Sequence, residues 1–176
     1  MSFEIVSSET MFTGRIFDVR RDHVRLPDGK VAKFEFVVHE KSITLLPIDQ
    51  DGQIWFIEQF RHPVGKNLLE LPAGVMGKGE EPIVAAQREL REETGVAARE
   101  LTCIGEFYLA PGYSDEYMYV YLARQLYPAP LTPDEDEFIR VIKTPAVEAL
   151  RMGENGQIFD AKTLAALLLA RPYLGI

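Results

Sequence analysis

The chain has 176 residues, of which 47% are apolar and 26% charged, as is ordinary for one globular domain. Its 19 lysines and arginines face 27 aspartates and glutamates, a formal net charge of −8 without a basic run, so duplex nucleic acid and membrane surfaces are poor candidate partners. The single cysteine, Cys103, excludes an internal disulfide and a cysteine-based zinc site. With no apolar run of transmembrane length, these features predict a cytoplasmic protein.

Strand patterns dominate the first ~60 residues. Residues 17–39 predict a β-hairpin, because Pro27-Asp28-Gly29 is a turn signal between two apolar runs. A second pair of strands is expected at 43–48 and 54–57, with the turn at Asp51-Gly52. Further strands are expected at 101–108, 117–124 and 137–143.

The first clear helix is expected over 82–94. Pro82 suits the first turn, where its missing N–H is no loss, and Gly95 suits the position just past the end. A shorter helix near 145–152 is expected to open at Pro145.

A last helix is expected over about 160–170, with Asp160 as its N-cap. Its apolar spacing places three leucines on the buried face: Leu164, Leu167 and Leu168. Strands that flank one helix, with a terminal helix to cover the other sheet face, predict an α/β sandwich on a mixed sheet.

Three glutamates form the most informative pattern. Glu89, Glu92 and Glu93 stand at i, i+3 and i+4 and share one helical face. They repel by roughly a few tenths of a kcal/mol per pair, near a helix end where the dipole disfavours anions. A hard divalent cation, Mg²⁺ or Mn²⁺, would relieve this repulsion. The alternative is a solvated face whose charges Arg88 and Arg91 balance.

The stretch 74–96 resembles the Nudix box, Gly-x5-Glu-x7-Arg-Glu-U-x-Glu-Glu-x-Gly-U, in which U is apolar. It fits at every specified position: Gly74, Glu80, Arg88, Glu89, Leu90, Glu92, Glu93, Gly95 and Val96. The resemblance implies a Nudix-type α/β/α sandwich with a mixed β-sheet and an additional N-terminal antiparallel strand region. We expect that region at 1–40, serving dimerisation and base binding, and a Nudix domain at 41–176.

The resemblance also implies roles for the box residues. A divalent metal, Mg²⁺ with Mn²⁺ as the alternative, is held by Ala73 through its carbonyl and by Glu89, Glu92 and Glu93, of which the last two are also catalytic. Structural support comes from Gly74, Glu80, Arg88 and Gly95, with an ion pair between Glu80 and Arg88. Bound metal would let an acidic protein bind an anionic diphosphate.

Pro111 follows Gly95 by 16 residues and opens Pro-Gly-Tyr-Ser-Asp-Glu. This setting resembles the ADP-ribose pyrophosphatase branch of the family, although a plain Pro-Gly turn is the alternative. The resemblance includes Gly112 and implies that Glu116 lies near the metals or the terminal ribose. A loop glutamate that orients or deprotonates water is expected at Glu135 first and Glu137 second, the alternative being a solvated acidic loop.

Further substrate contacts are implied by the same branch. Arg61 would contact the pyrophosphate, unless it forms an ion pair with Glu58 or Glu70, and Glu70 would support substrate or metal. Adenine would be held by the N-terminal strands, often those of a partner subunit, with the alternative that the aromatic residues are core; the candidates are Phe17, Phe34, Glu35 and Phe36. Enzymes of this kind are typically homodimers that exchange N-terminal strands.

Together these features predict Mg²⁺-dependent hydrolysis of ADP-ribose to AMP and ribose 5-phosphate. One alternative is a Nudix hydrolase of another nucleoside diphosphate sugar, such as GDP-mannose, or of a dinucleotide. Others are a non-catalytic nucleotide-sugar sensor and a purely structural domain. The expected partners are a small nucleotide sugar and a second copy of the chain, with no nucleic acid and no membrane.

Overall fold

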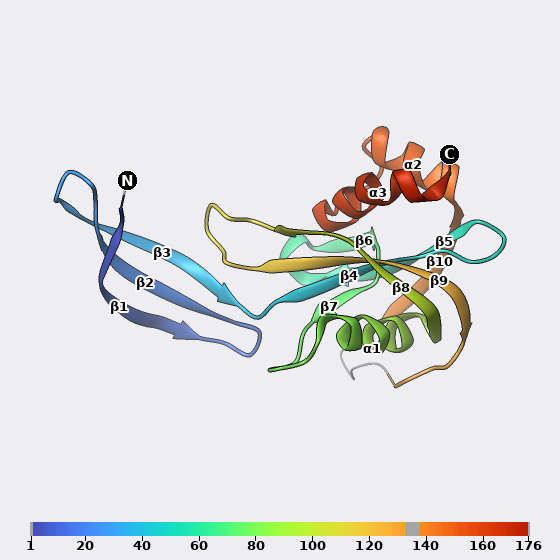
Figure 1. The fold of residues 1–176 in the computed structure, drawn as a ribbon, viewed down its shortest axis with the longest axis horizontal. Coiled ribbons are helices and arrows are strands. Elements are labelled where there is room, and N and C mark those ends of the chain that lie inside the picture. Colours follow the sequence, from blue (N-terminus) through green and yellow to red (C-terminus); the bar gives the residue numbers. More distant parts are fainter. Residues whose placement is uncertain (1, 133–137, 176) are drawn as a thin grey trace. The chain divides into compact units, whose positions relative to one another are not determined.

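The fold is described by a computed structural model, for residues 2–132 and 138–175 (Figure 1). The chain forms two compact units. The first contains the residues up to Lys41 and the segment Tyr108–Tyr117; the second contains Ser42–Phe107 and the residues from Met118 onward. None of the helices in these described ranges is both long and apolar enough to cross a bilayer.

The N-terminal unit is built on a three-stranded antiparallel sheet in the order β1-β2-β3. The expected hairpin is confirmed by β2 (Phe17–Arg25) and β3 (Val31–His39), with Gly29 at a positive φ of 86° in the turn. Strand β1 (Glu4–Thr13) lies within the expected N-terminal strand region, but its bounds were not predicted. All ten of its residues are exposed, so burial imposes no alternation from which a strand could be recognised.

The segment Tyr108–Tyr117 belongs to the same unit because it bonds to the end of β3. The Val37 N–H donates to the Tyr113 carbonyl at 2.8 Å, and the Asp115 N–H donates to the Val37 carbonyl at 3.1 Å. The Asp115 side chain accepts the His39 N–H at 2.8 Å. A loop far along the sequence thus completes the N-terminal unit.

Two sheets form the second unit. One is four-stranded, in the order β7-β4-β9-β8, with β4 parallel to β9 and antiparallel to β7; the other is antiparallel, in the order β10-β5-β6. The strands are β4 (Ser42–Pro47), β5 (Gln53–Arg61), β6 (Lys66–Glu70), β7 (Ala73–Val75), β8 (Val96–Tyr108), β9 (Tyr117–Pro128) and β10 (Ile139–Pro145).

The strands expected at 43–48 and 54–57 do not pair with each other along their length, so this part of the prediction is wrong. Both strands exist, and Gly52 turns the chain at a φ of 72°, but a single bridge between Ile48 and Ile54 joins them. Strands β4 and β5 then enter different sheets. Both edges of β4 are occupied, by β7 and by β9, and all six of its residues are buried, so β5 must pair elsewhere.

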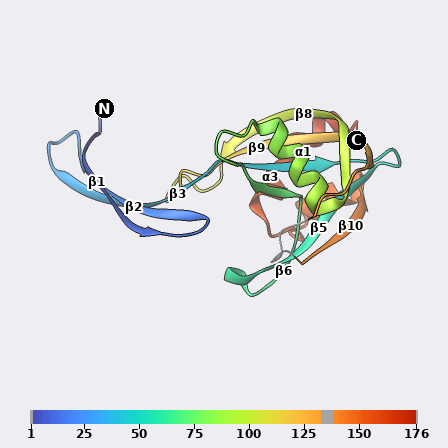
Figure 2. The ribbon, with the colours of Figure 1, turned by 90° about the horizontal axis from the view of Figure 1, so that it is seen from below.

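The helices cover opposite faces of the second unit. They are α1 (Pro82–Thr94), α2 (Ala146–Glu154) and α3 (Ala161–Leu174), with a short 3₁₀ turn at His62–Val64. In Figure 1, α1 lies below the strands and α2 and α3 lie above them. Seen from below in Figure 2, α1 lies in front of β4 and β9.

Alternation along β4 explains these layers. Ile43 and Leu45 pack in one core with Leu90 of α1, whereas Leu46 packs in a second core with Leu167 of α3. Successive residues of a strand point to opposite faces, so one strand supplies both cores. The predicted α/β/α sandwich on a mixed sheet is confirmed.

The expected limits of α1 and the expected cap of α3 are confirmed. Helix α1 begins at Pro82 and ends before Gly95, whose φ is 74°. Asp160 caps α3 by accepting the Thr163 N–H at 3.0 Å.

The expected buried face of α3 is partly wrong. Leu167 is 3% exposed, but Leu168 is 70% exposed and Leu164 is also exposed. Alanines and the first-turn pair Lys162 and Thr163 fill the inner face instead. The helix is apolar all round, so leucine spacing alone could not identify its inner side.

Candidate active site

Three glutamates of α1 form a ridge, which we call the carboxylate ridge: Glu89, Glu92 and Glu93. Glu89 and Glu93 are buried, at 7% and 5% exposure, and Glu92 is partly exposed. Buried carboxylates are costly unless cations or N–H donors compensate them. The contacts of these three glutamates therefore show which cations and N–H donors compensate their charge.

Strand β7 lies directly against the ridge. The Ala73 N–H donates to Glu93 Oε2 at 2.8 Å. A methyl group placed on Gly74 would lie 2.0 Å from the Glu89 carboxyl carbon, well inside contact distance. The glycine of the box is thus explained by the approach of the Glu89 carboxylate to the backbone.

Arg88 ties the loop before α1 to the ridge. Its Nε and Nη2 donate to the two oxygens of Glu80, both at 3.0 Å, so the expected ion pair is present. Its Nη1 donates to Glu89 at 2.6 Å and to Glu92 at 3.0 Å, and Nη2 also reaches the Val75 carbonyl.

The two ends of this ion pair stabilise each other's charge. The pKa of Arg88 is raised mainly by its hydrogen bonding to Glu80. The charge and hydrogen bonding of Glu89 and the hydrogen bond to Glu92 raise it further. The hydrogen bonds from Arg88 hold the pKa of Glu80 below its usual value. Glu80 also accepts the Gly77 N–H at 2.7 Å, which closes the loop onto α1.

The ridge fits a divalent cation in its donor chemistry. All of its side-chain donors are carboxylate oxygens, the ligands that hard cations such as Mg²⁺ prefer. Within the described residues, no group of three or more histidine, cysteine or acidic side chains stands in metal-ligand geometry. Arg88 pairs with Glu89 and Glu92, and Glu93 accepts the Ala73 amide. A cation would compete with Arg88 Nη1 for two of these carboxylates.

Arg61 is the last residue of β5 and Glu70 the last residue of β6, and their side chains meet although Glu70 lies opposite Ile57 in the strand pairing. Arg61 Nε and Nη2 donate to the two oxygens of Glu70 at 2.8 and 2.7 Å, so the alternative of an ion pair with Glu70 is what the structure contains. Glu58 pairs with Arg140 instead, at 2.9 Å. Burial acts to raise the pKa of Glu70, but Arg61 and Lys162 outweigh it and hold the pKa below its usual value.

Several expected substrate residues lie in the N-terminal unit. Pro111 and Gly112 form a turn in which the Tyr113 N–H donates to the Ala110 carbonyl at 3.0 Å, so the expected Pro-Gly turn exists. Glu116 is half-buried. Phe17 and Phe34 are exposed, against the core alternative, and Glu35 pairs with Arg21 at 2.8 Å. Glu135 and Glu137 lie outside the described residues.

Two further groups were not predicted from the sequence. In the N-terminal unit the Arg20 guanidinium stacks on Phe36 at 4.6 Å from the ring centre, beside the buried Asp22. In the second unit Lys162 is buried and contacts Glu70. Neither has a distinctive local pattern, because a strand arginine and a helix lysine are ordinarily solvated.

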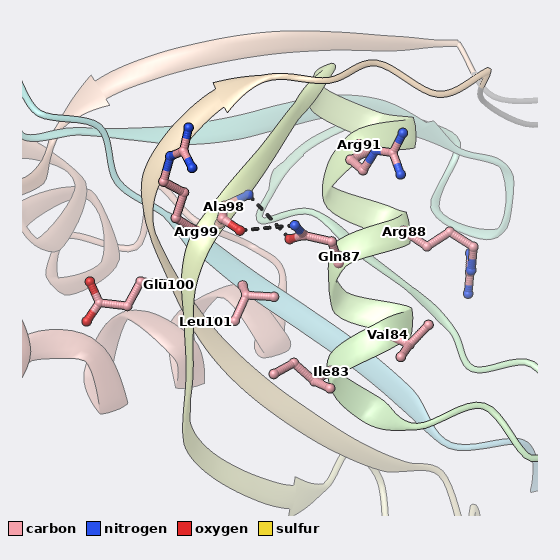
Figure 3. A pocket seen from close by; sticks show the side chains of 9 residues that line it. All are labelled: Ile83, Val84, Gln87, Arg88, Arg91, Ala98, Arg99, Glu100 and Leu101. Carbon is pink, nitrogen blue, oxygen red and sulfur yellow. Dashed lines mark hydrogen bonds between the residues drawn. The ribbon is translucent and has the colours of Figure 1, made fainter.

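A groove of about 660 Å³ lies between α1 and the start of β8. Gln87 bridges it, donating to the Ala98 carbonyl at 3.0 Å and accepting the Ala98 N–H at 3.3 Å. Figure 3 shows Gln87 directed at β8 and Arg88 directed to the opposite side of α1. Arg88, which binds Glu89 and Glu92 of the carboxylate ridge, is also one of the residues that line this groove.

Two family models match successive parts of the chain. The model of the NUDIX domain matches residues 38–167, and that of the nucleoside diphosphate sugar hydrolase N-terminal domain matches residues 3–37. The first match covers well over half of the chain. The chain belongs to the Nudix family. Nudix hydrolases generally need a divalent metal, which agrees with the donor chemistry of the ridge.

Individual relatives of this Nudix protein match nearly its whole length. An ADP-ribose pyrophosphatase of Bacillus subtilis is 40% identical over 92% of this chain and 89% of its own. One from Mycobacterium tuberculosis is 39% identical, over 94% and 82%. A crystal structure of an ADP compounds hydrolase superposes with a TM-score of 0.89 at 26% identity, covering 99% of this chain and 95% of that one.

Proposed function

We propose that this Nudix hydrolase cleaves the diphosphate of ADP-ribose to AMP and ribose 5-phosphate, with Mg²⁺ at the carboxylate ridge. The observation that carries the proposal is the packing of buried Glu89 and Glu93 against β7 within a complete Nudix box. Two relatives that match nearly the whole chain are named ADP-ribose pyrophosphatases, which favours this substrate over other nucleoside diphosphate sugars.

The ridge and β7 would hold the metal through Glu89, Glu92, Glu93 and the Ala73 carbonyl. Bound divalent metal polarises a phosphoryl oxygen and lowers the pKa of a water molecule. Glu93 keeps one oxygen on the Ala73 amide, which fixes its orientation. Arg88 and Glu80 hold the loop between β7 and α1 against the helix.

The remaining roles fall to residues that bind and orient the substrate. Arg61 would bind the diphosphate, because its cation stands at the end of β5 with part of its surface exposed. Glu135 or Glu137 would accept the proton of the attacking water. Pro111, Gly112 and Glu116 would contact the ribose end, and Phe17 and Glu35 would contact adenine; Glu70 supports Arg61.

We also propose a cytoplasmic homodimer. The N-terminal unit exposes many large apolar side chains on a small sheet, among them Ile5, Met11 and Phe12 on β1. Apolar patches of this kind mark interaction surfaces. A second copy of the chain fits because β1 is an edge strand, whose unpaired backbone groups favour association with a strand of another chain.

The test of the activity is the hydrolysis of ADP-ribose in ¹⁸O-water with and without Mg²⁺, with mass analysis of both products. We expect AMP and ribose 5-phosphate, label in one of them, and loss of turnover with a chelator. Glu93→Gln should lower kcat by several orders of magnitude while thermal unfolding stays near that of the wild type. The matched control is Glu81→Gln, an exposed glutamate at the start of α1.

Three outcomes would contradict the proposal. Unchanged turnover in Glu93→Gln would remove the ridge from the reaction. Faster turnover of GDP-mannose or of a dinucleotide than of ADP-ribose, in a panel at equal concentrations, would assign another substrate. Absence of turnover with every member of the panel, at full metal occupancy, would favour a sensor.

A further inference from the structure

The buried carboxylate of Glu70 is shared by two cations. Glu70 is 1% exposed. Arg61 binds both of its oxygens, and Lys162 from the first turn of α3 binds Oε2 as well. Lys162 is also 3.0 Å from Asp160, which makes a neutral set of two cations and two anions. Such compensation is what allows Glu70 to be ionised inside the protein.

The two cations differ in how they are held. The Lys162 side chain is 9% exposed, and Asp160 and Glu70 fix its amino group. The Arg61 side chain is 37% exposed, and its hydrogen bonds to the described residues use Nε and Nη2 rather than Nη1. Lys162 is therefore the fixed partner of Glu70, whereas Arg61 has a hydrogen-bond donor available for a ligand.

Arg61 also lies within electrostatic reach of the carboxylate ridge. Hydrogen bonding to Glu70 is the main cause that raises the pKa of Arg61, and the charges of Glu70 and then Glu93 add to it. A diphosphate bound near Glu93 would compete with Glu70 for this guanidinium. Each bond that Arg61 gave up would reduce the compensation of a buried carboxylate, which is costly when no other cation is present.

We infer that Lys162 is a positioning residue for substrate binding: it keeps Glu70 compensated, so that Arg61 can turn its donors to an anionic diphosphate. The inference rests on the proposed function, since it takes the ligand to be a nucleoside diphosphate sugar. Lys162 itself touches no substrate. Its effect passes through Glu70 to Arg61.

Local structure keeps Lys162 in this place. Asp160 caps α3 by accepting both the N–H and the hydroxyl of Thr163. The Thr163 hydroxyl oxygen in turn accepts the Leu71 N–H at 2.8 Å, one residue after Glu70. The first turn of α3 is thereby tied to the end of β6.

The test compares Lys162→Met with the matched control Lys66→Met. Lys66 is an exposed lysine of β6 that stacks on Phe159, so its loss removes one positive charge but no ion pair of Glu70. We expect Lys162→Met to raise KM for ADP-ribose by about tenfold or more with kcat within about threefold, because ground-state binding is weakened and the ridge is intact. Lys66→Met should leave both constants near the wild type, and Lys162→Arg should recover most of the affinity.

A double variant separates this role from general support of the fold. In Glu70→Gln there is no buried charge to compensate, so adding Lys162→Met should change KM no further. The double variant, in which neither residue 70 nor residue 162 is charged, also provides a folded reference if Lys162→Met alone is unstable. A wild-type KM in Lys162→Met, or equal effects in the two backgrounds, would overturn the inference. Wild-type protein that cleaves no nucleoside diphosphate sugar would overturn the proposed function and the inference with it.

Discussion

Gly74 shows how a single residue of the box is dictated by its surroundings. Its backbone φ is not in the positive region, so conformational freedom does not explain it. The Glu89 carboxylate occupies the space that a Cβ would need. Glu89 cannot simply move away, because it is buried and bound to Arg88.

Gly74→Ala should therefore displace Glu89 and damage the ridge. We expect kcat for ADP-ribose hydrolysis to fall by at least about a hundredfold, as for a loss of catalytic geometry. We also expect a loss of stability of about 1–3 kcal/mol from overpacking, measured by urea unfolding. Gly153→Ala in α2 is the control, since its Cβ would meet ordinary contacts and alanine favours helices. Wild-type activity in Gly74→Ala would show that the close approach of Glu89 to Gly74 is not needed for activity.

At the scale of this site, the sequence predicted that three glutamates share one helical face and offered the Arg61–Glu70 ion pair as an alternative, but it did not indicate Lys162. The spacing of Glu89, Glu92 and Glu93 on one helix is a local pattern that can be read directly. The contact between Lys162 and Glu70 joins residues 92 positions apart. It depends on how α3 docks against β6, which no local pattern contains.

Among the elements, α3 has the most informative side-chain arrangement. Adjacent leucines have opposite environments: Leu167 packs in the core shared by α2, α3, β4 and β5, whereas Leu168 is largely exposed. The sequence predicted both to be buried. Which face of an apolar helix turns inward is decided by docking, here by small alanines and by the buried first turn.

This difference gives a prediction on stability. Leu167→Ala should reduce the free energy of unfolding by about 2–5 kcal/mol, because it removes buried methyl groups and leaves a cavity. Leu168→Ala, one residue further along, should change it by less than about 0.5 kcal/mol. Chemical denaturation of both variants checks this, and similar losses at the two sites would mean that α3 docks through a different face.

The strands show the same division between local and distant information. The turn signals at Gly29 and Gly52 were read correctly, since positive φ favours glycine at both positions. The partners of β4 could not be read, because a fully buried strand pairs with whichever strands the rest of the fold supplies.

For the whole molecule, the exposed apolar side chains of the N-terminal unit are the feature on which the proposed homodimer rests. Strand β1 alone presents Ile5, Val6, Met11 and Phe12 to solvent. A monomer would have to keep this surface in water, at a cost of about 25 cal/mol per Å² of apolar area.

Ile5→Asp and Phe12→Asp should therefore weaken the dimer. We expect light scattering to report twice the mass of one chain for the wild type and a shift toward one chain's mass in the variants, since a charge in an apolar interface is disfavoured. Val147→Asp on α2 is the control, an exposed apolar residue of the second unit. A monomeric wild type, or equal masses for all variants, would contradict the proposed dimer.

The guanidinium of Arg88 has a consequence for how this protein meets its inorganic partner. Its single positive charge is shared with Glu89 and Glu92 as well as with Glu80, so part of the repulsion among these acidic groups is relieved by the polypeptide itself. Small zinc domains, by contrast, lack a folded state until their ion arrives. We therefore expect a newly made chain to fold before it acquires its ion, so that gain or loss of the ion would change turnover without unfolding the protein.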